Sequence, residues 1–310
     1  MLKPLFVGPF LIITISFLNC GAPKRLINNE KAFPEELIHF VPYDHNPVFA
    51  GTGTNTWDNQ IRERGYILFE DGLFHLWYTG YKSGMDEEKH LGYATSTDGI
   101  NWTRYKDNPV YSAGWVEDVF VMKEQDTYYM FAEGKNDIAH LLTSTDRINW
   151  TERGNLDIRK SNGEPIGKGP YGTPAVLKEK GIWYLFYERD DLGIWLASSK
   201  DLKTWTNIQD EPIIKMGPNN YDKFGVAVNQ VIKYKGLYYA YYHGTAFQDW
   251  SKWSTCVAVS RDLKNWEKYE RNPIIGEDTS SGILVNDGKQ LIMYTMHPDI
   301  RLFYPAIRQP

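Results

Sequence analysis

A short motif recurs four times along the chain, and this repetition limits the folds open to the sequence more than any other feature. Each copy is a tight polar turn followed by a tryptophan that opens a strand. The four copies are Ser96–Trp102, Ser144–Trp150, Asp201–Trp205 and Asp262–Trp266. An aromatic segment precedes each turn, and a fifth such segment, Gln290–Tyr294, has no turn of its own. Each repeat spans about 50 residues, which is enough for the four antiparallel strands of a propeller blade.

The repeats predict an all-β fold, a five-bladed β-propeller of four-stranded antiparallel blades. The blades are expected to start near Ile61, Val116, Tyr171, Phe224 and Ser280. The last blade has room for only three strands before Pro310, so residues 37–41 are expected to add the fourth and close the ring. A β-sandwich of similar strands is the alternative, but the recurring turn and tryptophan favour the propeller. The Asp residues of the turns are expected to shape those turns, and the tryptophans to pack between blades.

The N-terminus has the pattern of an export signal. An apolar run after Lys3 is too short for a membrane span of about 20 residues, and it ends at Leu18-Asn19-Cys20-Gly21, which resembles a bacterial lipoprotein signal. Cys20 is therefore expected to carry a lipid anchor, and ordinary cleavage is the alternative. The expected segments are a signal peptide at 1–20, a linker at 21–36 and the propeller at 37–310. The protein would be exported to the periplasm, the outer membrane or the cell surface, and would contact the membrane only through the anchor.

Composition narrows the function. Aromatic residues make up 15% of the chain, and they favour strands and also supply flat faces on which sugar rings stack. The net charge is -5, so the chain offers no basic face for nucleic acid. If Cys20 is lipidated, Cys256 is left without a disulfide partner, and its apolar neighbours predict a buried side chain. No Cys/His spacing indicates a metal site and no cofactor is predicted, although a structural cation could occupy the central channel. An oligosaccharide is the expected partner.

Several segments resemble the five-bladed propeller glycosidases, the clan of glycoside hydrolase families 32, 43, 68, 117 and 130. The likeness is carried by Trp115–Val119 with Asp126–Met130, by Gly92–Gly99 and by Asn108-Pro109. The resemblance implies three carboxylates: a base or nucleophile in blade one, a supporting Asp in blade two and an acid in blade three. Only Asp118 matches, as the supporting Asp. An alignment of the aromatic strands places Arg64 and Gly172 opposite Asp118, so the triad is incomplete, and Asp58 is the nearest replacement for the first carboxylate.

Propeller topology predicts which side chains share one pocket. In each blade the start of the first strand, the end of the second and the start of the third lie at the same face of the ring. Charged and polar residues replace the aromatic pattern at these places, which indicates a shared cavity. The residues expected there include, beside Asp118, Arg62, Arg64, Glu133, His140, Tyr171, Glu188, Arg189, His243 and His297, together with Tyr81, His90, Glu117, Lys135, Asn229, Gln230, Ser280 and Ser281.

Two chemistries and one binding function remain open for this pocket. A glycosidase would use Glu188 or Glu133 as the acid, Asp58 as the base and Asp118 to orient and tune them. A uronate lyase or oligosaccharide dehydratase would neutralise the substrate carboxylate with Arg62, Arg64 and Arg189, and would move protons with His140, His243 and Tyr171. A non-catalytic saccharide-binding propeller is the third alternative. The three arginines predict an anionic substrate, a uronate-bearing or sulfated oligosaccharide of plant or algal origin.

Overall fold

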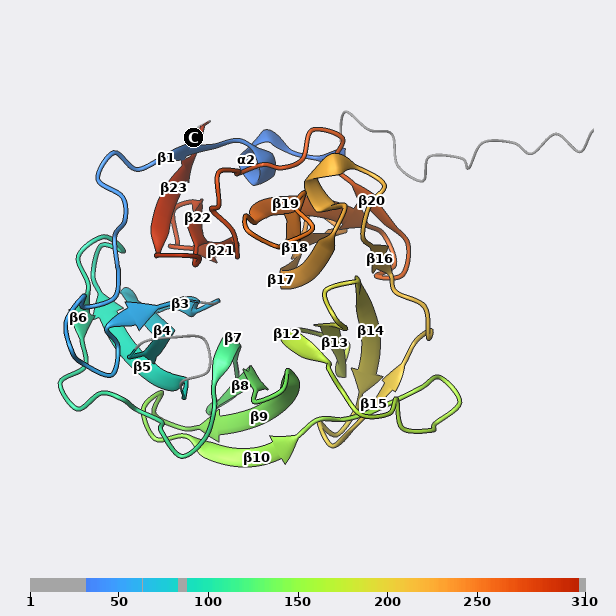
Figure 1. Cartoon of the computed structure of the whole chain (residues 1–310), viewed down its shortest axis with the longest axis horizontal. Helices are drawn as coiled ribbons and strands as arrows, with labels where there is room; N and C mark the ends of the chain where they lie inside the picture. Colours follow the sequence, from blue (N-terminus) through green and yellow to red (C-terminus); the bar gives the residue numbers. More distant parts are fainter. Residues whose placement is uncertain (1–31, 63, 83–87, 307–310) are drawn as a thin grey trace, which may run out of the picture.

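A computed structural model describes residues 32–62, 64–82 and 88–306, and it is a five-bladed β-propeller (Figure 1). Five sheets surround a central axis, and β3, β7, β12, β17 and β21 are the strands nearest that axis. The predicted all-β class, the number of blades and the antiparallel pattern are therefore confirmed. The predicted export signal and Cys20 lie outside the described residues. In the described part of the chain, no helix has the length and the apolar character that a membrane span requires.

Within each blade, strands that follow one another from the inner to the outer edge are neighbours in the sheet, and a few short strands are added at the edges. Blade one contains β2 (Gln60–Ile61), β3 (Tyr66–Glu70), β4 (Leu73–Tyr81), β5 (His90–Ser96) and β6 (Thr103–Arg104). Blade two contains β7 (Glu117–Glu124), β8 (Thr127–Gly134), β9 (Ile138–Ser144) and β10 (Thr151–Asn155). Blade three contains β12 (Gly172–Glu179), β13 (Ile182–Glu188), β14 (Gly193–Ser199) and β15 (Thr204–Asn207), extended by β11 (Asp157–Arg159) and β16 (Ile214–Lys215). Blade four contains β17 (Gly225–Tyr234), β18 (Leu237–Thr245), β19 (Ser254–Ser260) and β20 (Trp266–Lys268), preceded by the short helix η1 (Asn220–Asp222). Blade five contains β21 (Ile283–Asn286), β22 (Leu291–Thr295) and β23 (Arg301–Pro305).

An N-terminal strand closes the ring, as predicted, but it begins at Phe40 and not at residue 37. Strand β1 (Phe40–Pro42) pairs with β23 in blade five. Residues Glu35–Ile38, part of which was expected to be strand, form the helix α2 instead. The apolar side of this helix is buried, and the Tyr241 hydroxyl donates to the carbonyl of Leu37. Phe33 is also buried, against Tyr269, so residues assigned to the linker pack on the propeller.

The repeated motif has the two roles that its sequence predicts. In each turn the serine hydroxyl accepts hydrogen bonds from two backbone amides, and the Asp carboxylate accepts two more, as Ser144 and Asp146 illustrate. Each tryptophan then packs on an aromatic ring of the preceding blade. The pairs are Trp102 with Tyr294, Trp150 with Trp77, Trp205 with Phe131 and Trp266 with Phe186, with ring centroids 5.9–6.4 Å apart. These four contacts connect the blades at four of the five junctions of the ring, all except that between blades four and five.

Candidate active site

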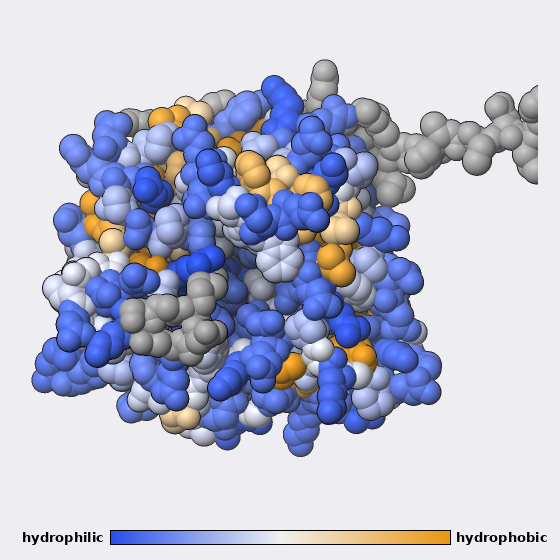
Figure 2. Space-filling model, viewed as in Figure 1, coloured by the Kyte–Doolittle hydropathy of each residue, from blue (hydrophilic) through white to orange (hydrophobic). Residues whose placement is uncertain are grey.

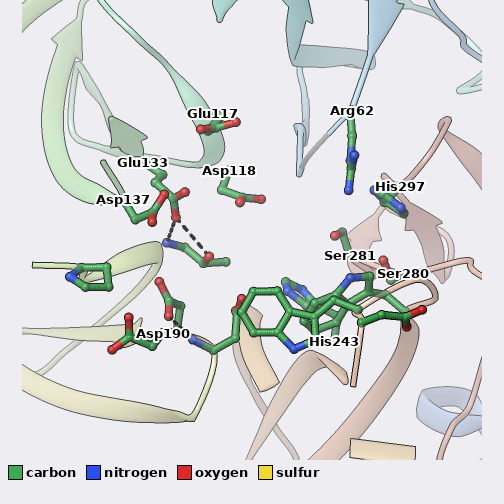
Figure 3. Close-up of a pocket in the computed structure, with 17 residues that line it drawn as sticks. Arg62, Glu117, Asp118, Glu133, Asp137, Asp190, His243, Ser280, Ser281 and His297 are labelled. Carbon is green, nitrogen blue, oxygen red and sulfur yellow. Dashed lines mark hydrogen bonds between the residues drawn. The ribbon is translucent and has the colours of Figure 1, made fainter. Parts of the chain in front are cut away.

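A cavity of about 490 Å³ opens at the centre of one face of the ring (Figures 2 and 3). Figure 2 shows this face to be mostly hydrophilic and hollowed near its middle. All five blades contribute to the lining. The lining residues are Arg62, Glu117, Asp118, Glu133, Asp137, Pro170, Thr173, Glu188, Asp190, Asp191, His243, Asp249, Trp250, Trp253, Ser280, Ser281 and His297.

Blades two and three supply an acidic wall. Asp118 lies at the start of β7, Glu133 near the end of β8 and Glu188 at the end of β13, and all three are buried. Burial, and then repulsion from Asp118 and other nearby carboxylates, raises the pKa of Glu133 well above its usual range. Burial also raises the pKa of Glu188 to about 7, although two backbone amides oppose the shift. This wall therefore holds carboxyl groups that keep a proton at a pH where an ordinary carboxyl group has lost it.

Backbone amides of β12 fix the two glutamates. The Thr173 amide donates to Glu133 Oε2 at 2.6 Å, and the neighbouring Gly172 amide donates to Glu188 Oε1 at 3.0 Å. The Asp191 amide donates to the other Glu188 oxygen at 2.7 Å. A Cβ atom on Gly172 would overlap Glu133 Oε2 and would lie 2.8 Å from Glu188 Oε1. The two carboxylates therefore converge on one residue, and only glycine leaves room for both.

β-Bulges shape this wall and correct the alignment of blade three. Glu117 pairs with Glu133 in blade two, and Gly172 pairs with Glu188 in blade three, so Thr173 and not Gly172 is the counterpart of Asp118. In both strands the register then shifts, and Asp118 and Thr173 have positive φ angles of 46° and 44°. Non-glycine residues rarely adopt such angles, and bulges of this kind redirect side chains next to active sites. Because both strands carry the same bulge, the bulge does not offset the two blades, and the alignment that placed Gly172 opposite Asp118 was simply one residue out of register.

The opposite wall has a different chemistry. Figure 3 shows Arg62, His297, Ser280 and Ser281 facing the carboxylates across the cavity. Burial, and then the charge of Arg62, lowers the pKa of His297 to about 4. Burial, and then the charge of Arg64, lowers the pKa of His243 to about 3, and His243 Nδ1 lies 2.7 Å from Asn229 Oδ1. Both imidazoles are therefore neutral at pH 7, and His243 donates through Nδ1 to the asparagine.

The cavity brings together nine of the residues predicted from the sequence. They are Arg62, Glu117, Asp118, Glu133, Glu188, His243, Ser280, Ser281 and His297. Of the residues that do not line it, five had a predicted chemical role, and the structure places each of them elsewhere. They are Asp58, Arg64, His140, Tyr171 and Arg189.

Arg64 was expected at the mouth, but it lies in the body of the propeller with no exposed surface. Its guanidinium donates to the backbone carbonyls of three neighbouring blades. The acceptors are the carbonyls of Asp118, Val119, Pro174, Val228 and Asn229. Its own backbone amide donates to Asp118 Oδ1 at 2.8 Å. Arg64 therefore connects blades one to four beneath the cavity and has no guanidinium nitrogen left for a substrate.

Asp58 was expected to act as a base, but it belongs to a bracing network outside the cavity. Its carboxylate accepts from Tyr78, from Thr56 and from the Arg104 guanidinium, each at 3.0 Å. Blade four repeats this network. Asp222 accepts from Tyr242 and from Lys268, and the sequence separations of 20 and 46 residues are the same in both blades. A repeated set with the same spacing indicates a role in the architecture of the blade.

The other three residues also lie outside the cavity. His140 is buried, and its Nδ1 lies 2.9 Å from the Glu152 carboxylate. Tyr171 lines a neighbouring groove of about 850 Å³, which shares Asp137, Pro170 and Asp190 with the cavity. Arg189 is half-buried and lines neither space.

The sequence reasoning missed several carboxylates that do line the cavity. Asp137, Asp190, Asp191 and Asp249 all lie in loops that join the second and third strands of a blade. Those loops were expected at this face, so their position was a usable signal. With Glu117, Asp118, Glu133 and Glu188, the lining then has eight acidic side chains against one arginine. No three His, Cys, Asp or Glu side chains in residues 32–62, 64–82 and 88–306 are grouped to hold a metal ion.

Comparisons with known proteins agree with the propeller fold. Residues 31–167 match the family described as Glycosyl hydrolases family 32 N-terminal domain. Over 225 residues the chain is 31% identical to the 1,2-beta-oligomannan phosphorylase of Thermoanaerobacter sp. (strain X514), covering 67% of this chain and 72% of that protein. The fold is similar to that of a β-1,2-mannobiose phosphorylase from Listeria innocua (TM-score 0.65, 16% identity, 86% of this chain and 95% of that one). It is also similar to a glycosyl hydrolase from Bacteroides ovatus (TM-score 0.66, 16% identity, 86% and 92%).

Proposed function

The chain belongs to the family of five-bladed β-propeller glycoside hydrolases and phosphorylases that includes 1,2-beta-oligomannan phosphorylase, and from this premise we propose that it cleaves glycosidic bonds with Glu188 as the general acid. The observation that carries the proposal is a buried carboxyl with a pKa of about 7 inside the central cavity. A group with this pKa is partly protonated at neutral pH and readily releases its proton, as departure of a sugar oxygen requires.

Asp118 is the best candidate for the base. Burial raises its pKa, but the Arg64 guanidinium and the Arg64 amide both favour its ionised form. In hydrolysis Asp118 would accept a proton from water as the water oxygen bonds to the anomeric carbon. The bond from that carbon to the glycosidic oxygen would break, and Glu188 would protonate the departing oxygen. Glu133, whose pKa is raised further, is the second candidate for the acid.

Phosphorolysis is a second candidate reaction, because Arg62, Ser280 and Ser281 form a polar wall opposite the acids. A phosphate bound there would replace water as the nucleophile and would need no base. We propose hydrolysis as the main reaction, since a phosphate dianion would meet one arginine and two neutral imidazoles among eight acidic side chains, of which Glu133 and Glu188 have raised pKa values.

The same lining argues for a neutral substrate. The anionic substrate was predicted from three arginines, but Arg64 and Arg189 do not line the cavity. Hydroxyl groups of a neutral sugar can donate to the many carboxylates, whereas a uronate or sulfate would be repelled by them. Elimination next to a uronate is not favoured for the same reason. By analogy with the named relatives, we propose a β-1,2-linked mannooligosaccharide as the substrate.

One experiment tests these choices together. The purified protein is incubated with β-1,2-mannooligosaccharides, with and without inorganic phosphate, and the products are separated by chromatography. We expect free mannose at the same rate in both reactions. If the product formed with phosphate is a sugar 1-phosphate, the reaction is phosphorolysis and the proposal of hydrolysis is wrong. Absence of cleavage, together with an unsaturated product from a uronate oligosaccharide, would contradict the proposal.

We also propose that the protein is exported and anchored through Cys20, from the signal pattern in its first 20 residues. The Cys20→Ala variant is then expected to leave the membrane fraction and to accumulate as an uncleaved precursor, because the lipid is attached to that thiol. Cell fractionation with immunoblotting measures both effects. Unchanged membrane association of the variant would rule out lipidation.

A further inference from the structure

An exposed aromatic ring stands at the rim of the cavity, on the loop between β18 and β19. Trp250 lines the cavity and is 44% exposed. Phe247, in the same loop, is 46% exposed but does not line the cavity. Large aromatic side chains that are left open to solvent inside a binding cavity gain stability when a ligand covers them.

The ring of Trp250 is held in a fixed position. Its indole nitrogen donates to the carbonyl of Phe224 at 3.0 Å, and its backbone amide donates to the carbonyl of Phe247 at 3.1 Å. Its φ angle is +54°, which is unfavourable for a bulky residue. A strained conformation of this kind is usually retained where the side chain has a function.

A second aromatic layer supports this ring from below. Trp253 lies with its ring centroid 6.0 Å from that of Trp250, at an angle of 59°. Trp253 in turn packs edge-on against His243, at 4.9 Å and 86°. The three rings form a continuous wall from the rim to the interior of the cavity, because Trp253 and His243 also line it.

We propose that Trp250 is a platform on which a sugar ring of the substrate stacks, outside the ring that carries the cleaved bond. The inference rests on the proposed function, and it predicts that the protein prefers longer neutral oligosaccharides. The C–H face of a sugar is apolar and matches the indole face, while its hydroxyl groups lie at the edge. Asp249, the neighbour of Trp250, lines the cavity and can accept a hydrogen bond from such a hydroxyl.

Kinetics on a series of neutral β-1,2-mannooligosaccharides of increasing length test this platform. The Trp250→Ala variant is expected to have a KM raised about tenfold for a tetrasaccharide, with kcat unchanged, and a KM changed less than about twofold for a disaccharide. Trp250→Phe keeps a flat ring and is expected to recover most of the loss. Phe247→Ala is the matched control, because it removes an equally exposed ring from the same loop, and it is expected to behave as the wild type. An equal effect of Trp250→Ala at every length, or no effect on KM, would overturn the proposal.

A binding measurement separates this inference from the proposed reaction. Calorimetry with the tetrasaccharide compares the Glu188→Gln variant with the Glu188→Gln, Trp250→Ala double variant. We expect binding to weaken about tenfold in the double variant, even if the wild type cleaves nothing. Equal binding by the two variants, or no binding by the Glu188→Gln variant, would overturn the platform. Neither result would contradict cleavage of the substrate, which the product analysis tests separately.

Discussion

The Glu188→Gln variant is expected to lose about 10²- to 10⁴-fold in kcat on a natural oligosaccharide, the range that general acid catalysis contributes. Glutamine keeps the shape of the side chain and can still accept from the Gly172 amide, which donates to Glu188 Oε1. It has no proton to give to the departing sugar oxygen. Initial rates under saturating substrate measure the loss.

The pH dependence supplies the second part of this result. Because the pKa of Glu188 is raised to about 7, the acid is protonated below that pH and ionised above it. The kcat of the wild type should therefore fall as the pH rises through about 7, and this decline should be absent from the residual activity of the variant. The Glu188→Gln variant should also lose much less kcat on an aryl mannoside, because an aryl leaving group departs without a proton.

Two further variants serve as controls. Glu133→Gln tests the alternative acid, since burial and neighbouring carboxylates also raise the pKa of Glu133. Asp58→Asn removes a carboxylate from the bracing network and is expected to lower thermal stability while leaving the pH profile unchanged. If the alkaline decline persists in Glu188→Gln and disappears in Glu133→Gln, the role of acid belongs to Glu133. If it disappears only in Asp58→Asn, our assignment of the site is wrong.

The fold was predictable because the repeat is local. Each turn is specified by a serine and an aspartate two residues apart, and each tryptophan follows at a fixed distance. The position of each blade can therefore be predicted from a short stretch of sequence. The exchange of strand for helix at Glu35–Ile38 was not predictable in this way. That segment occurs once, and it packs against blade four, where Tyr241, 204 residues along the chain from Leu37, donates to the Leu37 carbonyl.

The site was predictable only in part, because its geometry depends on bulges and on contacts between blades. The ends of β8, β13 and β18 were placed correctly at one face, and Glu133, Glu188 and His243 do line the cavity. The error at Asp58 could have been avoided. Asp58, Tyr78 and Arg104 recur in blade four as Asp222, Tyr242 and Lys268, and their equal spacing along the chain is enough by itself to indicate a structural repeat.

Arg64 shows the limit of reasoning from residue type. An arginine at the start of an inner strand was interpreted as a ligand for an anionic substrate, since a planar guanidinium matches a carboxylate. The central axis of a propeller, however, also brings together carbonyl groups that the sheets leave without partners. The carbonyls of Val119, Val228 and Pro174 converge there on Arg64. No sequence pattern distinguishes these two uses of the same side chain.

The Arg64→Ala variant is accordingly expected to lose about 3–5 kcal/mol in its free energy of unfolding. The substitution would leave buried carbonyls from three blades without donors, and it would remove the cation next to the buried Asp118 carboxylate. Arg64→Lys keeps the charge but lacks the planar fork, so it should recover only part of the loss. Urea denaturation followed by tryptophan fluorescence measures all three proteins.

Arg62→Ala is the matched control for this variant, since Arg62 is two positions away and lines the cavity. It is expected to change the unfolding free energy by less than about 1 kcal/mol, as substitutions away from the core usually do, while it alters binding in the cavity. If Arg64→Ala unfolds at the same urea concentration as the wild type and instead loses affinity for an anionic oligosaccharide, Arg64 is a substrate ligand after all. Every nitrogen of the Arg64 guanidinium already donates to a backbone carbonyl. Removal of this side chain should therefore lower the stability of the propeller and not its affinity for a ligand.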